Sequence, residues 1–69
     1  MKVLLRNTKT NLFFVGINQW TDDPNQARDF GKVEDAIRLD REEQMTGMEV
    51  ILRCDDPYGD LVLPLRKPG

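Results

Sequence analysis

Hydrophobic residues gather in four short runs along the chain, and polar or turn-forming residues separate these runs. Two runs cover residues 3–5 and 12–15, and two more cover residues 48–54 and 61–65. They are short and rich in aliphatic and aromatic side chains, which is typical of β-strands. The pattern therefore predicts four strands, two near each end of the chain.

The segments that flank these strands carry turn signals. Residues 7–11 contain two asparagines and two threonines, which favours a hairpin loop of about five residues. Gly16 is expected to end or bulge the second strand. Residues 56–59 match a type I turn, with proline second and glycine fourth. Pro64 predicts an edge strand, or the end of that strand, because proline cannot donate to a sheet.

A helix-start signature follows the second strand. Asp23 can cap a helix, Pro24 suits the first helical position, and Gln26 stands where the partner in a capping box belongs. We therefore expect a short helix over residues 24–29, closed by Phe30 and Gly31.

A longer helix is predicted over residues 33–45. Two acidic residues open this segment, and Gly47 lies just past its end. Its apolar stripe consists of Val33, Ala36 and Ile37, and the next stripe positions are Asp40 and Gln44. The buried face should therefore fade after two turns, leaving the later turns solvated or against a partner.

These elements predict an α+β fold in the order β-β-α-α-β-β. We expect one domain over residues 1–69, with a four-stranded antiparallel sheet and the helices on one face. The order of the strands in the sheet stays open at this point.

Alternation along the strands assigns the two faces of the sheet. Val3, Val50 and Leu63 belong to sets that can face the helices, and the opposite face then mixes apolar and basic residues. This helix-free face is a candidate interaction surface, and it consists of Leu4, Arg6, Ile51, Arg53, Val62 and Arg66. It can equally be an ordinary half-solvated face with scattered apolar residues.

Composition argues against catalysis and against the usual metal sites. The chain has one cysteine, Cys54, and contains neither histidine nor serine, so an intrachain disulfide, a Cys/His zinc site and a serine triad are excluded. The five glycines are isolated, so a phosphate-binding loop is not predicted. We expect no catalytic, cofactor-binding or metal site, and Cys54 is expected to be a buried thiol.

The aspartates form two clusters, which are predicted to serve as caps and turns: Asp22 and Asp23, and Asp55, Asp56 and Asp60. A carboxylate-based hydrolase is the alternative for these clusters, and it requires a cleft in which two acids face each other. Trp20 is expected to plug the end of the core, with Phe30 as a neighbour.

The expected compartment is the cytoplasm. A single thiol fits a reducing environment, and a charge follows the first leucines, so a signal peptide is not predicted. No run approaches the roughly 20 apolar residues of a membrane span. The formal net charge of −2 argues against nucleic acid as a partner, since phosphate binders are usually basic.

Three segments carry a resemblance to other sequences: Trp20-Thr21-Asp22-Asp23, Ala27-Arg28-Asp29-Phe30 and Val33-Glu34-Asp35-Ala36. This pattern resembles small uncharacterised bacterial and phage-encoded proteins. The resemblance implies a hairpin ending in Trp-Thr, a helical turn, and a second helix that places an alanine on the sheet. It implies no activity, and this chain has asparagines where those proteins often have glycine in the first hairpin.

The leading functional hypothesis is a small non-catalytic protein-interaction module. Its partner would be an unknown protein or a second copy, bound through the helix-free sheet face or an edge strand. The alternative is an accessory protein for single-stranded nucleic acid, in which Arg6, Arg53 and Arg66 contact phosphate and a phenylalanine stacks on a base.

Overall fold

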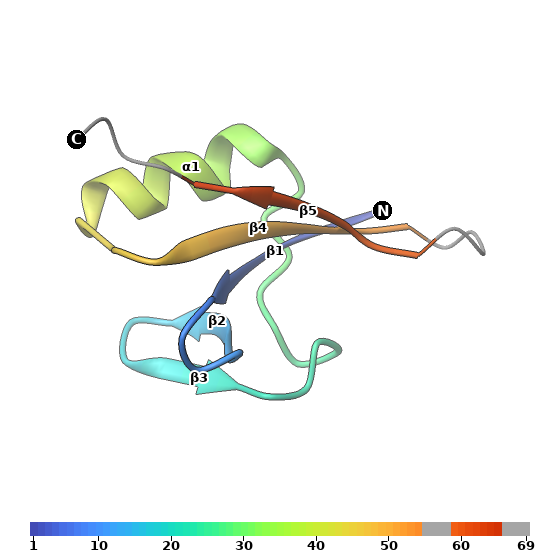
Figure 1. Ribbon diagram of the computed structural model, residues 1–69, viewed down its shortest axis with the longest axis horizontal. Helices are drawn as coiled ribbons and strands as arrows, with labels where there is room; N and C mark the ends of the chain where they lie inside the picture. The colour runs from blue at the N-terminus through green and yellow to red at the C-terminus, as the bar shows by residue number, and fades with distance from the viewer. Residues whose placement is uncertain (55–58, 66–69) are drawn as a thin grey trace.

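The computed structural model describes residues 1–54 and 59–65 as one antiparallel sheet with a single helix (Figure 1). The elements are β1 (Lys2–Asn7), β2 (Phe13–Gly16), β3 (Gln19–Thr21), α1 (Val33–Glu42), β4 (Met48–Arg53) and β5 (Leu61–Pro64). The α+β class is confirmed, but the sheet has five strands, and the described residues form one helix in place of the two predicted. Most of the turn predicted at residues 56–59, and Arg66, lie outside the described residues.

The strand order is β3-β2-β1-β4-β5, so the first strand lies in the middle of the sheet. β1 pairs with β4 along its whole length, from Lys2 opposite Arg53 to Asn7 opposite Met48. β5 pairs with β4 alone and forms one edge. The prediction that Pro64 marks an edge strand or its end is confirmed on both points, because Pro64 is the last residue of β5.

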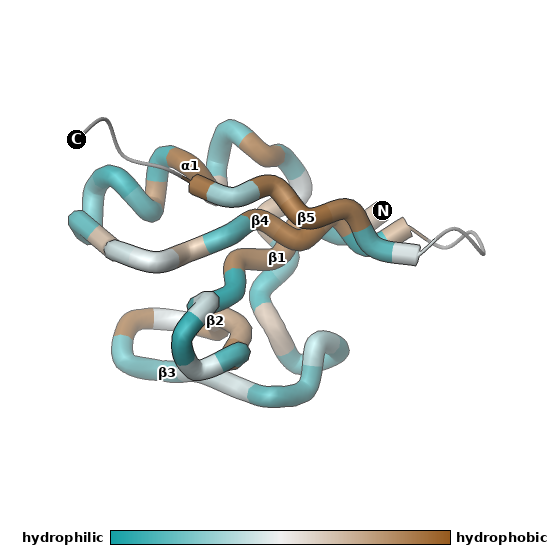
Figure 2. Tube along the Cα trace, viewed as in Figure 1, coloured by the Kyte–Doolittle hydropathy of each residue, from teal (hydrophilic) through white to brown (hydrophobic). Residues whose placement is uncertain are grey.

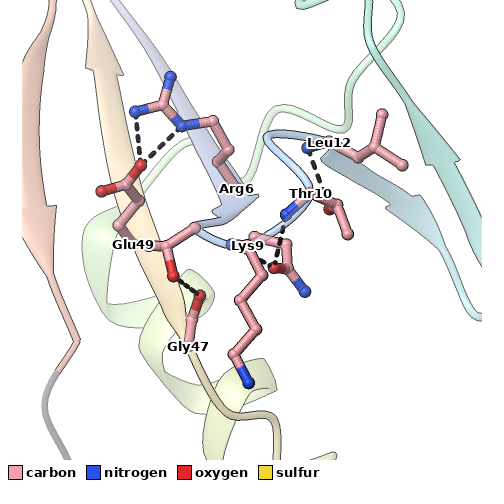
Figure 3. Close-up of polar contacts among 8 residues, drawn as sticks. Arg6, Lys9, Thr10, Leu12, Gly47 and Glu49 are labelled. Atoms are coloured by element: carbon pink, nitrogen blue, oxygen red, sulfur yellow. Dashed lines mark hydrogen bonds and ion pairs between the residues drawn. The ribbon is translucent and has the colours of Figure 1, made fainter.

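Asparagine organises the loop between β1 and β2, as the sequence predicts. The Asn7 side-chain oxygen accepts the N–H groups of Lys9 and Thr10, at 2.8 and 3.3 Å, and Asn11 adopts a positive φ of 60°. The Thr8 hydroxyl donates to the carbonyl of Gly47, 2.8 Å away, which ties this loop to the start of β4 (Figure 3). The loop therefore holds the central hairpin and β4 together.

The third strand was missed by the sequence analysis. β2 and β3 form a tight hairpin in which Gly16 lies opposite Gln19 and Asn18 adopts a φ of 61°. Asparagine tolerates this left-handed conformation, so Asn18 was an available turn signal. The register shifts between Phe14 and Gly16, which confirms the predicted irregularity at this glycine.

The helix predicted over residues 24–29 does not form. Asp23 does accept the N–H of Asn25 through its side chain, at 2.9 Å, and its carbonyl accepts the N–H of Gln26, at 3.0 Å. The cap therefore closes one turn, after which the chain is irregular. So short a helix gains few hydrogen bonds for the cost of its nucleation, and competing tertiary contacts therefore determine whether it forms.

The segment 27–30 instead runs between β1 and β2. Its backbone N–H groups at Arg28 and Phe30 donate to the carbonyls of Phe14 and Val3, at 3.0 and 2.9 Å. The Asp29 carboxylate accepts the Val3 N–H at 3.0 Å. The segment thus takes the place of a strand partner along the first half of β1.

The helix α1 ends earlier than predicted. The Met45 N–H donates to the Asp40 carbonyl and the Gln44 N–H to the Arg41 carbonyl, at 3.0 and 3.2 Å, which is the Schellman pattern. Gln44 takes the left-handed position with a φ of 50°, so the helix stops before Gly47.

Asp40 is buried, which corrects the expectation that the later turns are solvated. It follows Ala36 by four residues, and that alanine packs in the core. The helix therefore keeps the same side toward the sheet through its last turns, whatever residue occupies the position.

The sheet has a buried cluster on each face. On the helix side the cluster consists of Val3, Leu5, Phe14, Ala36, Met48 and Val50. On the reverse side it consists of Leu4, Phe13 and Ile51, with Ala27 packed against them. Because Ala27 belongs to the segment that replaces the predicted short helix, the missing helix and the covered reverse face have one cause.

The environment of Asp29 predicts that the folding stability depends on pH in acid solution. Hydrogen bonds from the Val3 and Gly31 N–H groups hold the pKa of its carboxyl below the ordinary value of 3.8. A lowered folded-state pKa stabilises the fold above about pH 3.8, and that contribution is lost as the pH falls through the folded-state pKa. Asp29→Asn keeps a side-chain oxygen acceptor but removes the titration.

We therefore expect the stability of the Asp29→Asn variant to fall less steeply below about pH 3.8 than that of the parent. Urea midpoints measured by circular dichroism, from neutral pH down to strongly acid solution, give the two slopes. Asp35→Asn, in the first turn of α1, is the control for the removal of one carboxylate elsewhere in the fold. Equal acid slopes in the parent and in Asp29→Asn would contradict the assignment.

Candidate functional site

The reverse face of the sheet is not open as predicted. Leu4 and Ile51, two of the six candidate contact residues, are 0% and 2% exposed. They pack with Phe13 and with Ala27 from the segment 27–30. These two side chains belong to the core, so the expectation that they are exposed on this face was wrong.

Arg6 lies on this face and contacts a carboxylate. It is directly opposite Glu49 across β1 and β4, and its Nε lies 2.6 Å from the Glu49 Oε1, with Nη2 on the same oxygen (Figure 3). Its guanidinium also lies 5.8 Å from the centre of the Phe13 ring, within range of a cation–π contact. Arg6 therefore holds strands together more than it faces solvent.

Arg53 also has an acidic neighbour. Its Nε lies 3.7 Å from an oxygen of Asp60, and both side chains are partly exposed. Of the three arginines assigned to phosphate contact, two therefore lie beside carboxylates, and the third, Arg66, is outside the described residues. A phosphate would have to compete with those carboxylates, so this arrangement does not favour nucleic-acid binding.

Val62 is the apolar candidate residue that remains exposed. It is 45% exposed, and its neighbours Leu61 and Leu63 are 59% and 40% exposed. These three residues form the β5 edge patch. Figure 2 shows the hydrophobic colour running along β5 at the border of the sheet.

The width of the helix explains why β5 stays uncovered. An α-helix is about 10 Å across, and neighbouring strands are about 4.8 Å apart, so one helix covers about two strands. Here α1 packs on β1 and β4. Leu61 and Leu63 do point to the helix side as predicted, but β5 lies beyond the reach of the helix, and the sequence analysis missed both residues for this reason.

The backbone of β5 has a defined hydrogen-bonding polarity. The Leu65 N–H donates to the Met48 carbonyl, at 3.2 Å, and alternate residues of an antiparallel strand bond to the same side. Leu61 and Leu63 therefore bond toward β4, while Val62 and Pro64 direct their backbone groups outward. Pro64 has no N–H, so the outer edge of β5 presents a full donor and acceptor pair at Val62 and a carbonyl alone at Pro64.

A hollow of the described surface lies between α1 and the segment 27–30. It has a volume of about 280 Å³, and its lining consists of Arg28, Asp29, Phe30, Asp35, Arg38, Leu39 and Glu42. Charges of both signs alternate around it, and Asp29 already accepts two backbone N–H groups. Two other carboxylates, Asp35 and Glu42, line the hollow together with the arginines Arg28 and Arg38.

The remaining candidate groups are dispersed. Among the residues that the structure describes, no three acidic or thiol side chains converge in a way that could hold a metal ion. Cys54 is half-buried, less than predicted. Trp20 packs edge-on against Phe14 with ring centres 5.6 Å apart, and Phe14 in turn stacks on Phe30 at 6.0 Å, so the tryptophan reaches Phe30 only through a second ring.

Comparison with known proteins adds no relationship. No family model, no curated protein and no solved structure matches the chain. Within residues 1–54 and 59–65, no helix is both long enough and apolar enough to cross a membrane.

Proposed function

We propose that this chain is a small non-catalytic protein-interaction module whose contact surface is the β5 edge patch, Leu61, Val62 and Leu63. The observation that carries the proposal is the exposure of three consecutive large apolar residues on an edge strand. Monomeric proteins usually protect such edges, because unpaired backbone groups beside apolar side chains are a template for pairing with another chain.

The mode of contact that fits this patch is strand addition. A partner strand placed beside β5 would bond to the outward groups of Val62 and Pro64, and side chains on both faces would supply specificity. The proposal keeps Val62 from the predicted surface and leaves out the buried Leu4 and Ile51. It adds the two leucines that the helix does not reach.

Photo-crosslinking tests whether β5 is the contact surface, whatever the partner is. A photoreactive amino acid replaces Leu61 or Leu63, and, as the matched control, Ile17, which is 61% exposed on the turn of the β2–β3 hairpin. In cells that produce the chain, adducts are expected from the two β5 positions and not from position 17. Equal yields at all three positions, or none from β5, would overturn the proposal.

A further inference from the structure

We infer that the strand that pairs with β5 is β5 of a second copy of this chain, antiparallel to the first and related to it by a two-fold axis at Val62. This inference rests on the proposed function, since it names the partner of the same edge. Its first support is the sequence of the patch, Leu61-Val62-Leu63, which reads identically in both directions. A palindromic edge is complementary to itself when two copies run antiparallel.

The backbone groups support the same axis. With the axis at Val62, the two Val62 residues exchange both of their N–H to carbonyl hydrogen bonds. Continuing the alternation of β5 by one residue would direct the Asp60 N–H outward, where it would donate to the Pro64 carbonyl of the other copy. The pair thus forms about four backbone hydrogen bonds. The bond from residue 64 to the Asp60 carbonyl is missing in each copy, because proline has no N–H.

The side chains match in this register on both faces of the sheet. Val62 lies opposite the second copy's Val62 on one face, and Leu61 lies opposite the second copy's Leu63 on the other. Each of the three exposed apolar residues then meets an apolar residue, so the pairing removes from water the same patch that α1 leaves uncovered.

The neighbouring registers are worse for identifiable reasons. An axis at Leu63 would place Pro64 opposite Val62, and the missing N–H would leave only about two hydrogen bonds. An axis at Leu61 would form as many bonds as the axis at Val62, but it would set the Asp60 carboxylate opposite Val62 and Gly59 opposite Leu63. The axis at Val62 alone combines the larger set of bonds with apolar neighbours.

The contact is small, which sets the conditions of the test. Specific, stable protein interfaces bury a total of at least about 1,200 Å². One strand from each copy buries less than this area, so the dimer is expected to be weak. Association should therefore be measured up to protein concentrations of about 1 mM, where a complex of low affinity is populated.

A charge exchange at the axis tests the inference, because a residue on a two-fold axis meets its own copy. Val62→Lys and Val62→Glu are each expected to weaken self-association at least about tenfold, since like charges would lie directly opposite each other. An equimolar mixture of the two variants should restore the dimer in sedimentation velocity, as a mixed pair. Ile17→Lys, on the exposed hairpin turn, should leave self-association unchanged.

The register is tested by disulfide formation in a Cys54→Ala background, which removes the native thiol. Leu61→Cys and Leu63→Cys chains, when mixed and oxidised, should form a mixed disulfide, since opposed residues lie within the about 4.4–6.8 Å between Cα atoms that a disulfide spans. Each variant alone should crosslink far less, because its two cysteines, one in each copy, would not lie opposite each other but two residues apart along the strands.

These outcomes separate the inference from the proposed function. A parent chain that stays monomeric at about 1 mM, or a mixture of Val62→Lys and Val62→Glu that does not associate, overturns the second copy as partner. Photo-adducts from Leu61 and Leu63 to a different protein would then still support β5 as the contact edge. Absence of all adducts from β5 removes both conclusions together.

Discussion

Replacing Leu4 with lysine is expected to unfold the domain. Leu4 is fully buried in the reverse-side cluster, and shortening a buried leucine to alanine alone costs about 2–5 kcal/mol. A domain of this size has a net stability of only about 3–5 kcal/mol, and lysine adds the cost of burying a charge. Loss of the folded circular dichroism spectrum, before any denaturant is added, is the expected measurement.

The chain offers a matched series for this prediction. Leu4, Ile51 and Val62 lie side by side across β1, β4 and β5 on one face, and only Val62 is exposed. Lysine at position 4 or 51 should unfold the domain, whereas lysine at position 62 should leave the free energy of unfolding within about 0.5 kcal/mol of that of the parent. A folded Leu4→Lys variant with the parental midpoint would show that the reverse face is open after all.

Local patterns in the sequence were sufficient for most of the strands. The alternation of β1 and β4 placed Val3 and Val50 on the helix side, where the structure has them, and the asparagines predicted the first loop. Pro64 predicted the edge because the lack of an N–H is a property of the residue itself. Such signals act within a few residues, so they can be interpreted from the sequence without knowledge of the rest of the fold.

The errors concern features that depend on distant contacts. The route of residues 27–30 is fixed by hydrogen bonds such as that from the Val3 N–H to Asp29, which joins residues 26 positions apart. The capping signal at Asp23 was real, but a cap followed by one turn and a cap followed by a helix share the same local sequence. The covered reverse face could not be predicted because nothing periodic marks the segment that covers it.

Only part of the candidate site was predicted from the sequence, because the exposure of its other residues depends on distant contacts. Val62 was identified because alternation separates it from Leu61 and Leu63, and its exposure on an edge strand agrees with that assignment. The two leucines were assigned to the correct face but were expected to be covered. Their exposure follows from the number of strands that one helix spans, which depends on strand order, and strand order is a global property.

Replacing Phe14 with alanine should cost about 3–5 kcal/mol, which is comparable to the whole net stability of so small a domain, so the variant is expected to be largely unfolded, with the β2–β3 hairpin released. β2 is in register with β1 at one residue pair only, so the buried Phe14 ring, packed between Trp20 and Phe30, provides much of the attachment of this hairpin. Trp20 is the single tryptophan of the chain, so its fluorescence reports directly on that attachment.

We expect the emission of Trp20 to shift to longer wavelength in the Phe14→Ala variant, because the indole, which is 38% exposed in the parent, loses its aromatic neighbour and becomes more exposed to water. Phe14→Leu, which keeps an apolar side chain of similar bulk, should lose less stability and show a smaller shift. Ile17→Ala, on the exposed turn of the same hairpin, should change neither signal. If Phe14→Ala and Ile17→Ala gave the same urea midpoint, the hairpin would have to be held by its backbone pairing and by the segment 27–30, and the stacked rings would contribute little.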